Sequence, residues 1–217
     1  MAIEMTIPMV TWNRRMKPEG TNEYTWVPQD SEDIFKGKRV VLFALPGAFT
    51  PTCSTTHLPG YEAKYDEILE QDVDEIYCLS VNDSFVMNAW FDSLGISMVQ
   101  PIADGNADFT RQMGMLVKKE PVCFGYRSQR YSMVVDNGRV EMIFVEEGKE
   151  DNFAGDPFSV SDATSMLEYL INVKDLRRSQ LKIQEEESAK NEETDESCTY
   201  KNDGFSHVID NSRNRKT

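Results

Sequence analysis

The sequence predicts one α/β domain, with a mixed central sheet flanked by helices, followed by an acidic tail. Short apolar runs alternate with amphipathic segments in the first half, a hairpin signal lies near residue 137, and apolar periodicity fades from about residue 177. A chain of 217 residues suits one domain with an appendage better than two small domains. We therefore expect a folded domain over residues 1–176 and a tail over residues 177–217.

The first strand is predicted over residues 40–45, an apolar run rich in β-forming side chains that ends at a Pro-Gly breaker. Residues 54–71 carry apolar side chains at helical spacing, so a helix is expected there. Pro59 and Gly60 must bend or interrupt its first turns. These elements form a strand-loop-helix unit.

The same alternation continues through the middle of the chain. A second buried strand is predicted over residues 76–81, and Asp83 or Ser84 can cap the helix that follows it. A short strand over residues 99–102 and a helix over residues 109–113 come next. Strands joined by helices in this way are expected to lie parallel.

The second half of the sequence predicts an antiparallel pair of strands. Residues 131–135 and 140–145 are two strands joined through Asp-Asn-Gly, the strongest hairpin signal in the chain. A closing helix capped by Ser161 or Asp162 carries an apolar stripe, and residues 6–27 predict an N-terminal hairpin. This order of elements is that of a thioredoxin-like fold with an N-terminal extension.

The predicted tail is strongly acidic. Residues 185–196 contain seven acidic residues and one lysine. Such a segment cannot bury enough apolar surface to offset the entropy lost on ordering, so we expect it to be partly helical or disordered.

Charge and composition exclude several classes of partner. The net charge of -14 repels phosphate backbones and anionic lipids, so neither nucleic acid nor a membrane is expected to bind. No apolar stretch approaches the ~20 residues of a membrane span, and the first residues do not resemble a secretory signal, so a cytoplasmic location is expected. The four cysteines form no CxxC pair and there are only two histidines, so no metal or other cofactor is expected.

Cys53 lies where the strand over residues 40–45 has ended and a helix begins, so backbone N–H groups can face its sulfur and favour the thiolate. A helix end contributes typically ~0.3 to 1 kcal/mol, and up to ~2 kcal/mol when it is partly buried, less than the roughly 3 to 4 kcal/mol that a predominantly ionised cysteine requires at neutral pH. A fixed cation is therefore needed. Arg130, directly before a predicted strand, is preferred to the neighbouring Arg127.

The loop before Cys53 suits a reaction with peroxides. Pro46 and Pro51 stiffen it, and Thr50 offers a hydroxyl that can hydrogen-bond the thiolate and a peroxide oxygen. A thiolate attacks one oxygen of the O–O bond while negative charge develops on the other, and an arginine stabilises that charge. The cysteine becomes a sulfenic acid, and the second product is water or an alcohol.

These residues reproduce a known motif. Pro46, Thr50 and Cys53 match the Pro-x-x-x-Thr-x-x-Cys pattern of peroxiredoxins, and the run over residues 46–61 resembles the type II, or peroxiredoxin-five, subfamily. The resemblance continues through residues 80–87, 104–106 and 130–135. The resemblance implies a thiol peroxidase that reduces hydrogen peroxide and alkyl hydroperoxides in antioxidant defence. It also implies the residues of the site: Cys53 as the peroxidatic cysteine, Arg130 as the active-site arginine, Pro46 and Thr50 completing the pocket, and Gly47 and Phe49 binding substrate.

The resemblance also bears on assembly and on the reductant. The subfamily forms dimers through the active-site end, which would suit Phe49 and Phe85 as contact residues of a homodimer. Residues 155–163 are especially similar to bacterial hybrids that carry a fused glutaredoxin domain, although this chain has no glutaredoxin motif. The late resolving cysteine of animal members is also missing. A one-cysteine cycle follows, with glutathione, glutaredoxin or thioredoxin as the external reductant.

Several alternatives remain open from the sequence. Cys78, inside an apolar strand, is expected to be an inert core residue, yet it or Cys198 of the tail is a candidate resolving cysteine. Cys123 has no evident partner. A cysteine hydrolase with His57 as its base is the main rival function, and a redox-inactive binding module is the second.

Overall fold

The computed structural model describes residues 5–18, 20, 21 and 23–199, with side chains described up to residue 185. The chain divides into two compact units, Met1–Asn172 and Val173–Thr217. The first unit contains the sheet, the site and the first turns of the last helix.

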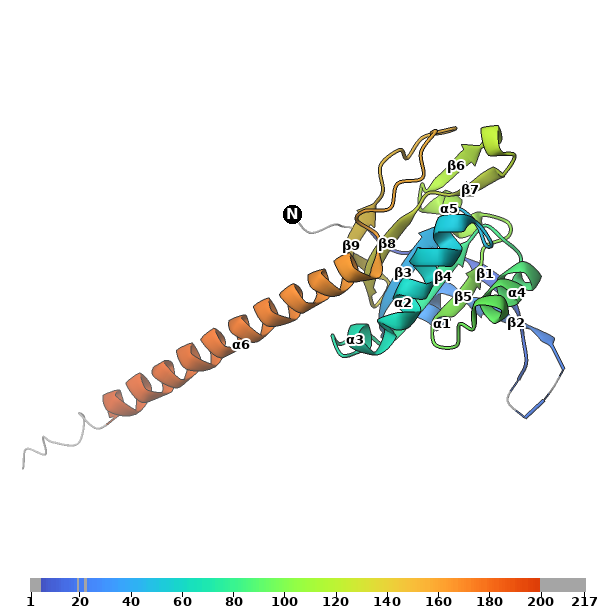
Figure 1. The fold of residues 1–217 in the computed structure, drawn as a ribbon. Coiled ribbons are helices and arrows are strands. Elements are labelled where there is room, and N and C mark those ends of the chain that lie inside the picture. Colours follow the sequence, from blue (N-terminus) through green and yellow to red (C-terminus); the bar gives the residue numbers. More distant parts are fainter. Residues whose placement is uncertain (1–4, 19, 22, 200–217) are drawn as a thin grey trace, which may run out of the picture. The chain divides into compact units, whose positions relative to one another are not determined.

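A five-stranded mixed sheet in the order β5-β4-β3-β8-β9 forms the centre of the first unit (Figure 1). The strands are β3 (Arg39–Leu45), β4 (Glu75–Ser80), β5 (Gln100–Ala103), β8 (Tyr131–Asp136) and β9 (Arg139–Val145). β3, β4 and β5 are parallel, whereas β8 is antiparallel to both β3 and β9. The predicted thioredoxin-like mixed sheet is confirmed. Asn137 and Gly138, at φ 46° and 79°, make the expected two-residue turn.

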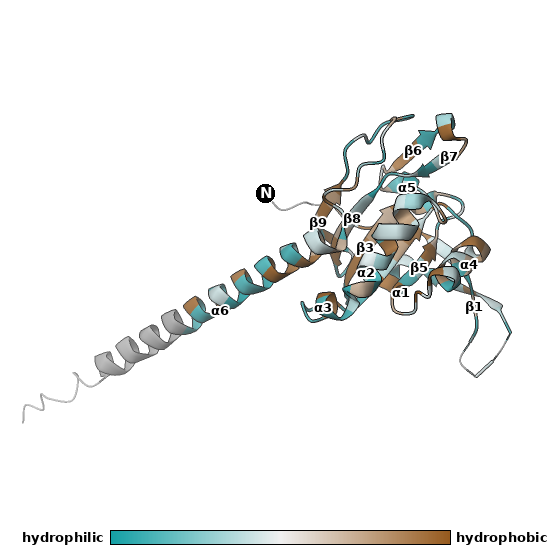
Figure 2. Ribbon diagram, viewed as in Figure 1, coloured by the Kyte–Doolittle hydropathy of each residue, from teal (hydrophilic) through white to brown (hydrophobic). Residues whose placement is uncertain are grey.

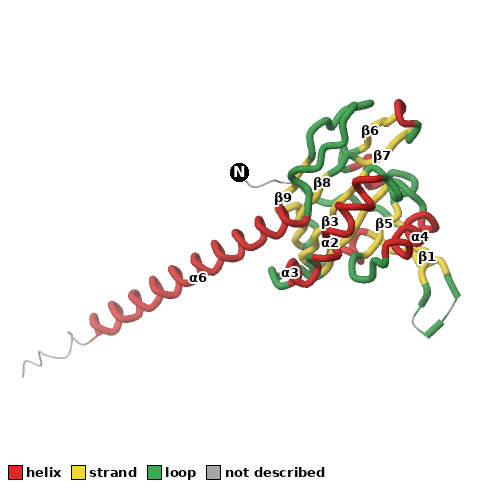
Figure 3. Tube along the Cα trace, in the orientation of Figure 1, coloured by secondary structure: helices red, strands yellow, loops and turns green. Residues whose placement is uncertain are grey.

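Both faces of the sheet are buried, each in its own hydrophobic cluster, and successive strand side chains point alternately to the two faces. Helices and strands of the domain are distinguished in Figure 3. One face packs against α2 (Leu58–Ala63), α3 (Tyr65–Leu69), α4 (Ser84–Leu94) and the start of α6 (Ala163–Thr199). The other face packs against α1 (Ser31–Phe35), α5 (Asp108–Gln112) and β1 (Thr11–Met16). The central strands are accordingly hydrophobic along their length (Figure 2).

The helical region after β3 differs in detail from the prediction. A π-helical turn, Cys53–His57, precedes α2, and the break lies at Lys64 rather than at Pro59 and Gly60. Pro59 is tolerated because it sits in the first turn of α2.

Three elements, β6, β7 and α1, were not predicted. β6 (Leu116–Lys119) and β7 (Gly125–Ser128) form a separate antiparallel hairpin, joined by a 3₁₀ turn, Glu120–Val122. Their short mixed-polarity sequences show no clear alternation. The five-residue helix α1 was also missed. The N-terminal hairpin was predicted correctly, and it consists of β1 and β2 (Thr25–Asp30).

The last helix continues beyond the apolar stripe that predicted it. Asp162 accepts hydrogen bonds from the Thr164 and Ser165 amides at its start, and α6 then runs to Thr199. The predicted tail thus begins as helix, while residues 200–217 lie outside the described part of the chain. Across the described residues, no helix combines the length and apolar character needed to span a bilayer.

Candidate active site

Strand pairing brings the two main residues of the site together. Ala44 near the end of β3 is paired with Tyr131 at the start of β8, and the two strands are antiparallel. The loop that follows β3 leads to Cys53, and Arg130 directly precedes β8. Both residues therefore emerge at the same edge of the sheet.

The Cys53 sulfur and the Arg130 guanidinium are in contact. Arg130 Nη1 lies 3.5 Å from Cys53 Sγ, and the two residues are 2% and 0% exposed, respectively. Arg127 instead donates to the backbone oxygens of Phe124 and Val81. The guanidinium is therefore placed where it can interact with negative charge at the sulfur or on a group bound beside it.

His57 holds the guanidinium from the protein interior. Arg130 Nη1 also donates to His57 Nδ1 at 3.2 Å, and His57 Nε2 lies 3.2 Å from the Ser161 carbonyl oxygen, to which it donates. Burial, and then the charge of Arg130, lower the pKa of His57 to about 3, so the ring is neutral at physiological pH. Both ring nitrogens are engaged away from Cys53, which argues against the hydrolase with His57 as its base.

The segment after β9 supplies the outer partner of the arginine. Asp156 Oδ1 accepts a hydrogen bond from Arg130 Nη2 in an ion pair, and the Phe158 ring centroid lies 5.5 Å from Arg130 Cζ. Glu146 anchors the end of this segment, because its carboxylate accepts from the Ser159, Val160 and Ser161 amides. Burial opposes ionisation of Glu146, but these hydrogen bonds outweigh it and lower its pKa to about 2.

A cavity of about 390 Å³ lies beside the site. Pro46 and Thr50 line it, together with apolar side chains of the connection between β6 and β7 and of the segment after β9: Pro121, Val122, Phe124 and Phe153. Thr50 Oγ1 donates to the Gly47 carbonyl oxygen at 2.9 Å rather than to the sulfur, which leaves its lone pairs free to accept. Gly47 and Phe49, which were expected to bind substrate, are not among the described residues that line the cavity. Phe49 is 57% exposed.

The other cysteines are placed differently. Cys78 is fully buried in the same core cluster as Cys53, and burial, with a smaller contribution from the Cys53 charge, raises its pKa well above the usual value. Cys123 is exposed, and Cys53, Cys78 and Cys123 are all free thiols. The side chain of Cys198 lies outside the described residues.

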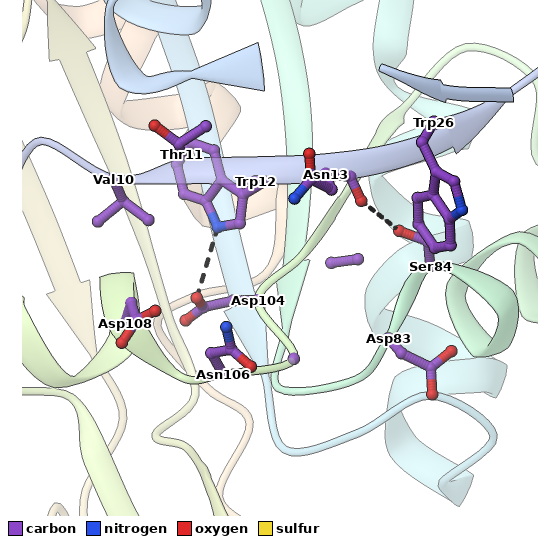
Figure 4. A pocket seen from close by; sticks show the side chains of 12 residues that line it. Val10, Thr11, Trp12, Asn13, Trp26, Asp83, Ser84, Asp104, Asn106 and Asp108 are labelled. Atoms are coloured by element: carbon purple, nitrogen blue, oxygen red, sulfur yellow. Dashed lines mark hydrogen bonds between the residues drawn. The ribbon is translucent and has the colours of Figure 1, made fainter. Parts of the chain in front are cut away.

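A second pocket is lined by residues of β1, of the start of α4 and of the segment after β5 (Figure 4). Trp12 Nε1 donates to Asp104 Oδ1 at 3.4 Å across it, and the Ser84 hydroxyl donates to the Asn13 carbonyl oxygen. Asp83 is engaged in capping α4. Within the described part of the chain, no group of three or more His, Cys, Asp or Glu side chains is arranged to hold a metal ion.

A free thiol beside a buried arginine, at the edge of a thioredoxin-like sheet, defines a thiol-dependent redox protein. Sequence comparison agrees, because the redoxin family model matches residues 18–167.

The similarity to individual proteins is high. A peroxiredoxin of Rhizobium etli is 51% identical over 173 residues, which cover 78% of this chain and 97% of that protein. The hybrid peroxiredoxin hyPrx5 of Haemophilus influenzae is 48% identical, over 76% of this chain and 64% of the hybrid. The structure of reduced Prx3 of Vibrio vulnificus in complex with hydrogen peroxide superposes with a TM-score of 0.68 at 39% identity, covering 78% of this chain and 99% of that one. The chain belongs to the type II peroxiredoxins and is a thiol-dependent peroxidase.

Three residues near the thiol were given no role by the sequence analysis. His57 was considered only as the base of a rival hydrolase, and Glu146 and Asp156 were not singled out. The stretch over residues 155–163 was noted for its similarity to the hybrid proteins, which was the one available signal for Asp156.

Proposed function

We propose that the protein reduces hydrogen peroxide and alkyl hydroperoxides at Cys53, with Arg130, Thr50 and Pro46 forming the catalytic pocket. The observation that supports this most strongly is the 3.5 Å contact between Arg130 Nη1 and Cys53 Sγ. In the first step the thiolate attacks the terminal peroxide oxygen, an S–O bond forms and the O–O bond breaks. The electron pair leaves with the second oxygen, which takes up a proton and departs as water or an alcohol.

The two pocket side chains have complementary roles in this step. Arg130 stabilises the negative charge that develops on the departing oxygen. The free lone pairs of Thr50 Oγ1 accept a hydrogen bond from the hydroperoxide O–H, which orients the oxygen under attack. The apolar lining of the neighbouring cavity supports organic hydroperoxides as substrates in addition to hydrogen peroxide.

Regeneration is assigned to an external thiol. Attack of glutathione on the Cys53 sulfenic acid gives a mixed disulfide and water, and a second thiol, delivered by glutathione itself or by glutaredoxin, releases the reduced cysteine. Thioredoxin is the alternative reductant. Cys78 is buried and un-ionised, so a bond to Cys53 would require local unwinding of the helix that begins at Cys53.

We further propose a homodimer that packs through the active-site end. Phe49 and Phe85 are each 57% exposed, which is unusual for large aromatic side chains. Analytical ultracentrifugation of the wild type and of Phe85→Ser tests this, because the variant is expected to shift toward monomer.

The function is tested by following peroxide consumption with glutathione alone, with glutathione and glutaredoxin, and with thioredoxin, for the wild type and Cys53→Ser. The variant is expected to be inactive in all three. Activity that persists without the Cys53 sulfur contradicts the proposal. Mass mapping after one equivalent of peroxide tests the one-cysteine cycle, which a stable Cys53–Cys78 or Cys53–Cys198 disulfide would overturn.

A further inference from the structure

Arg130 is held from two sides by unequal partners. On the interior side Nη1 is shared between the Cys53 sulfur and His57, whereas on the outer side Nη2 is paired with Asp156. Its Nε is buried and has no partner within the described residues. The guanidinium is therefore not fully saturated by hydrogen bonds, and its orientation depends on the few contacts it has.

Asp156 is carried by a segment that is fastened to the rest of the domain at several points; we call residues 147–160 the outer loop. In its first half Asp151 Oδ1 accepts from the Lys118 amide of β6 at 2.8 Å, and the Asn152 amide donates to the Lys118 carbonyl oxygen. The Asn152 side chain also exchanges hydrogen bonds with Glu120. At its far end Glu146 binds the amides of Ser159 and Val160. The side chain of Asp156 is 47% exposed, so burial alone does not hold it against the arginine.

The packing of the outer loop restricts where Asp156 can go. The Phe153 ring lies over Gly148, where an added Cβ would come within 2.2 Å of it, and a Cβ on Gly155 would come within 2.8 Å. Phe158 of the same loop lies against both the Arg130 guanidinium and the His57 ring. Seating the loop on β6 therefore sets the position of the carboxylate that meets Nη2.

We propose that Asp156 is a positioning residue for Arg130, through which the seating of the outer loop on β6 controls the rate of peroxide reduction. A carboxylate at Nη2 fixes the plane of the guanidinium, so that Nη1 stays on the sulfur and the departing oxygen. The inference rests on the peroxidase function proposed above and adds a residue and a loop to it.

The test is a set of single-turnover measurements, in which the rate constant for oxidation of the reduced protein by hydrogen peroxide is obtained by stopped flow. Asp156→Ala is expected to lower it about tenfold, and Asp156→Asn, which keeps an acceptor oxygen, to stay within about threefold of the wild type. Asp151→Ala removes one of the hydrogen bonds that seat the loop on β6, and it is expected to lower the rate constant by at most about threefold. Glu150→Ala removes the same charge from the adjacent exposed position and is expected to change it less than about twofold.

Double variants show whether Asp151 and Asp156 both affect the oxidation rate through Arg130. In an Arg130→Gln background Asp156→Ala is expected to have almost no further effect, and the Asp151→Ala/Asp156→Ala pair should react no more slowly than Asp156→Ala alone. Equal rates for the wild type and Asp156→Ala overturn the inference. So does a full tenfold loss on adding Asp156→Ala to the Arg130→Gln background. An Asp156→Asn variant that reacts as slowly as Asp156→Ala overturns it as well. A wild type that does not react with peroxide overturns the proposed function as well.

Discussion

Arg130 and Asp104 are both buried charges, on opposite faces of the same sheet, and they are satisfied in different ways. Asp104 is 1% exposed and accepts hydrogen bonds from the Phe109 and Thr110 amides, the Thr110 hydroxyl and the Trp12 indole. All of these contacts join Asp104 to other parts of the fold. Arg130, 2% exposed, directs one nitrogen at a sulfur, and its Nε has no hydrogen-bond partner in the part of the chain that the structure describes.

The difference separates a charge that stabilises the fold from one that is available for chemistry. A saturated buried carboxylate has no remaining capacity for a ligand, because its oxygens are already engaged. An incompletely paired guanidinium costs stability, but it can strengthen its interactions when negative charge develops nearby. Substitutions at the two sites should therefore affect different observables.

The largest effect is expected on activity at the arginine. Arg130→Gln should lower kcat/KM for hydrogen peroxide about 100- to 1000-fold, because the charge beside the sulfur is lost. Urea unfolding should show a much smaller change than the kinetics. Arg127→Gln is the matched control, and it should remain within about tenfold of the wild type. A comparable loss in both variants would contradict the special position of Arg130.

Asp104 should behave in the opposite way. Asp104→Ala leaves the Thr110 and Trp12 donors without their acceptor, so the free energy of unfolding should fall by about 3 kcal/mol. Peroxidase activity per folded molecule, measured well below the unfolding midpoint, should stay within about twofold. A variant that is stable but inactive would mean that the two faces are coupled.

The neutral His57 beside Arg130 predicts a dependence of stability on pH. Below pH 6.5, the ordinary pKa of histidine, His57 becomes protonated in the unfolded chain. In the folded protein it stays neutral down to about pH 3. The stabilisation is fully present above pH 6.5 and falls by about 1.4 kcal/mol per pH unit below it, or about 2 kcal/mol at pH 5. Glu146 acts in the same direction only below its ordinary pKa of 4.5, so the interval from pH 6.5 to 5 isolates the histidine.

Urea unfolding at several pH values measures this slope. His57→Gln should flatten it between pH 6.5 and 5, whereas His207→Gln, which replaces the other histidine of the sequence, should not. An unchanged slope in His57→Gln would assign the pH dependence to other groups.

The smallest of these effects is expected at Thr50. Thr50→Val removes the oxygen that accepts from the hydroperoxide and should lower kcat/KM about tenfold, whereas Thr50→Ser should restore most of the activity. Because Thr50 donates to Gly47, part of the loss in the valine variant reflects a loosened loop. Comparing kcat/KM for hydrogen peroxide and for cumene hydroperoxide separates the lost acceptor oxygen from the loosened loop, since a loosened loop should affect the larger substrate more.

Much of the fold was predictable because local patterns are strong in it. The apolar runs of β3 and β4, the Asn-Gly turn between β8 and β9 and the aspartate at the start of α4 each carry a signal within a few residues. β6, β7 and α1 were missed because their signals are short and of mixed polarity. The position of Cys53 after a buried strand was likewise a local inference.

Local sequence patterns were enough to predict the order of the main elements, the family motif at Pro46, Thr50 and Cys53, and a preference for Arg130 over Arg127. The contact itself depends on tertiary structure, because the antiparallel register of β3 and β8 brings Arg130 to the sulfur and leaves Arg127 bonded to backbone carbonyls. The tertiary structure also revealed the contacts of His57 and Asp156 with the guanidinium. Contacts between segments 26 to 77 residues apart depend on strand register and loop packing, which no local periodicity encodes.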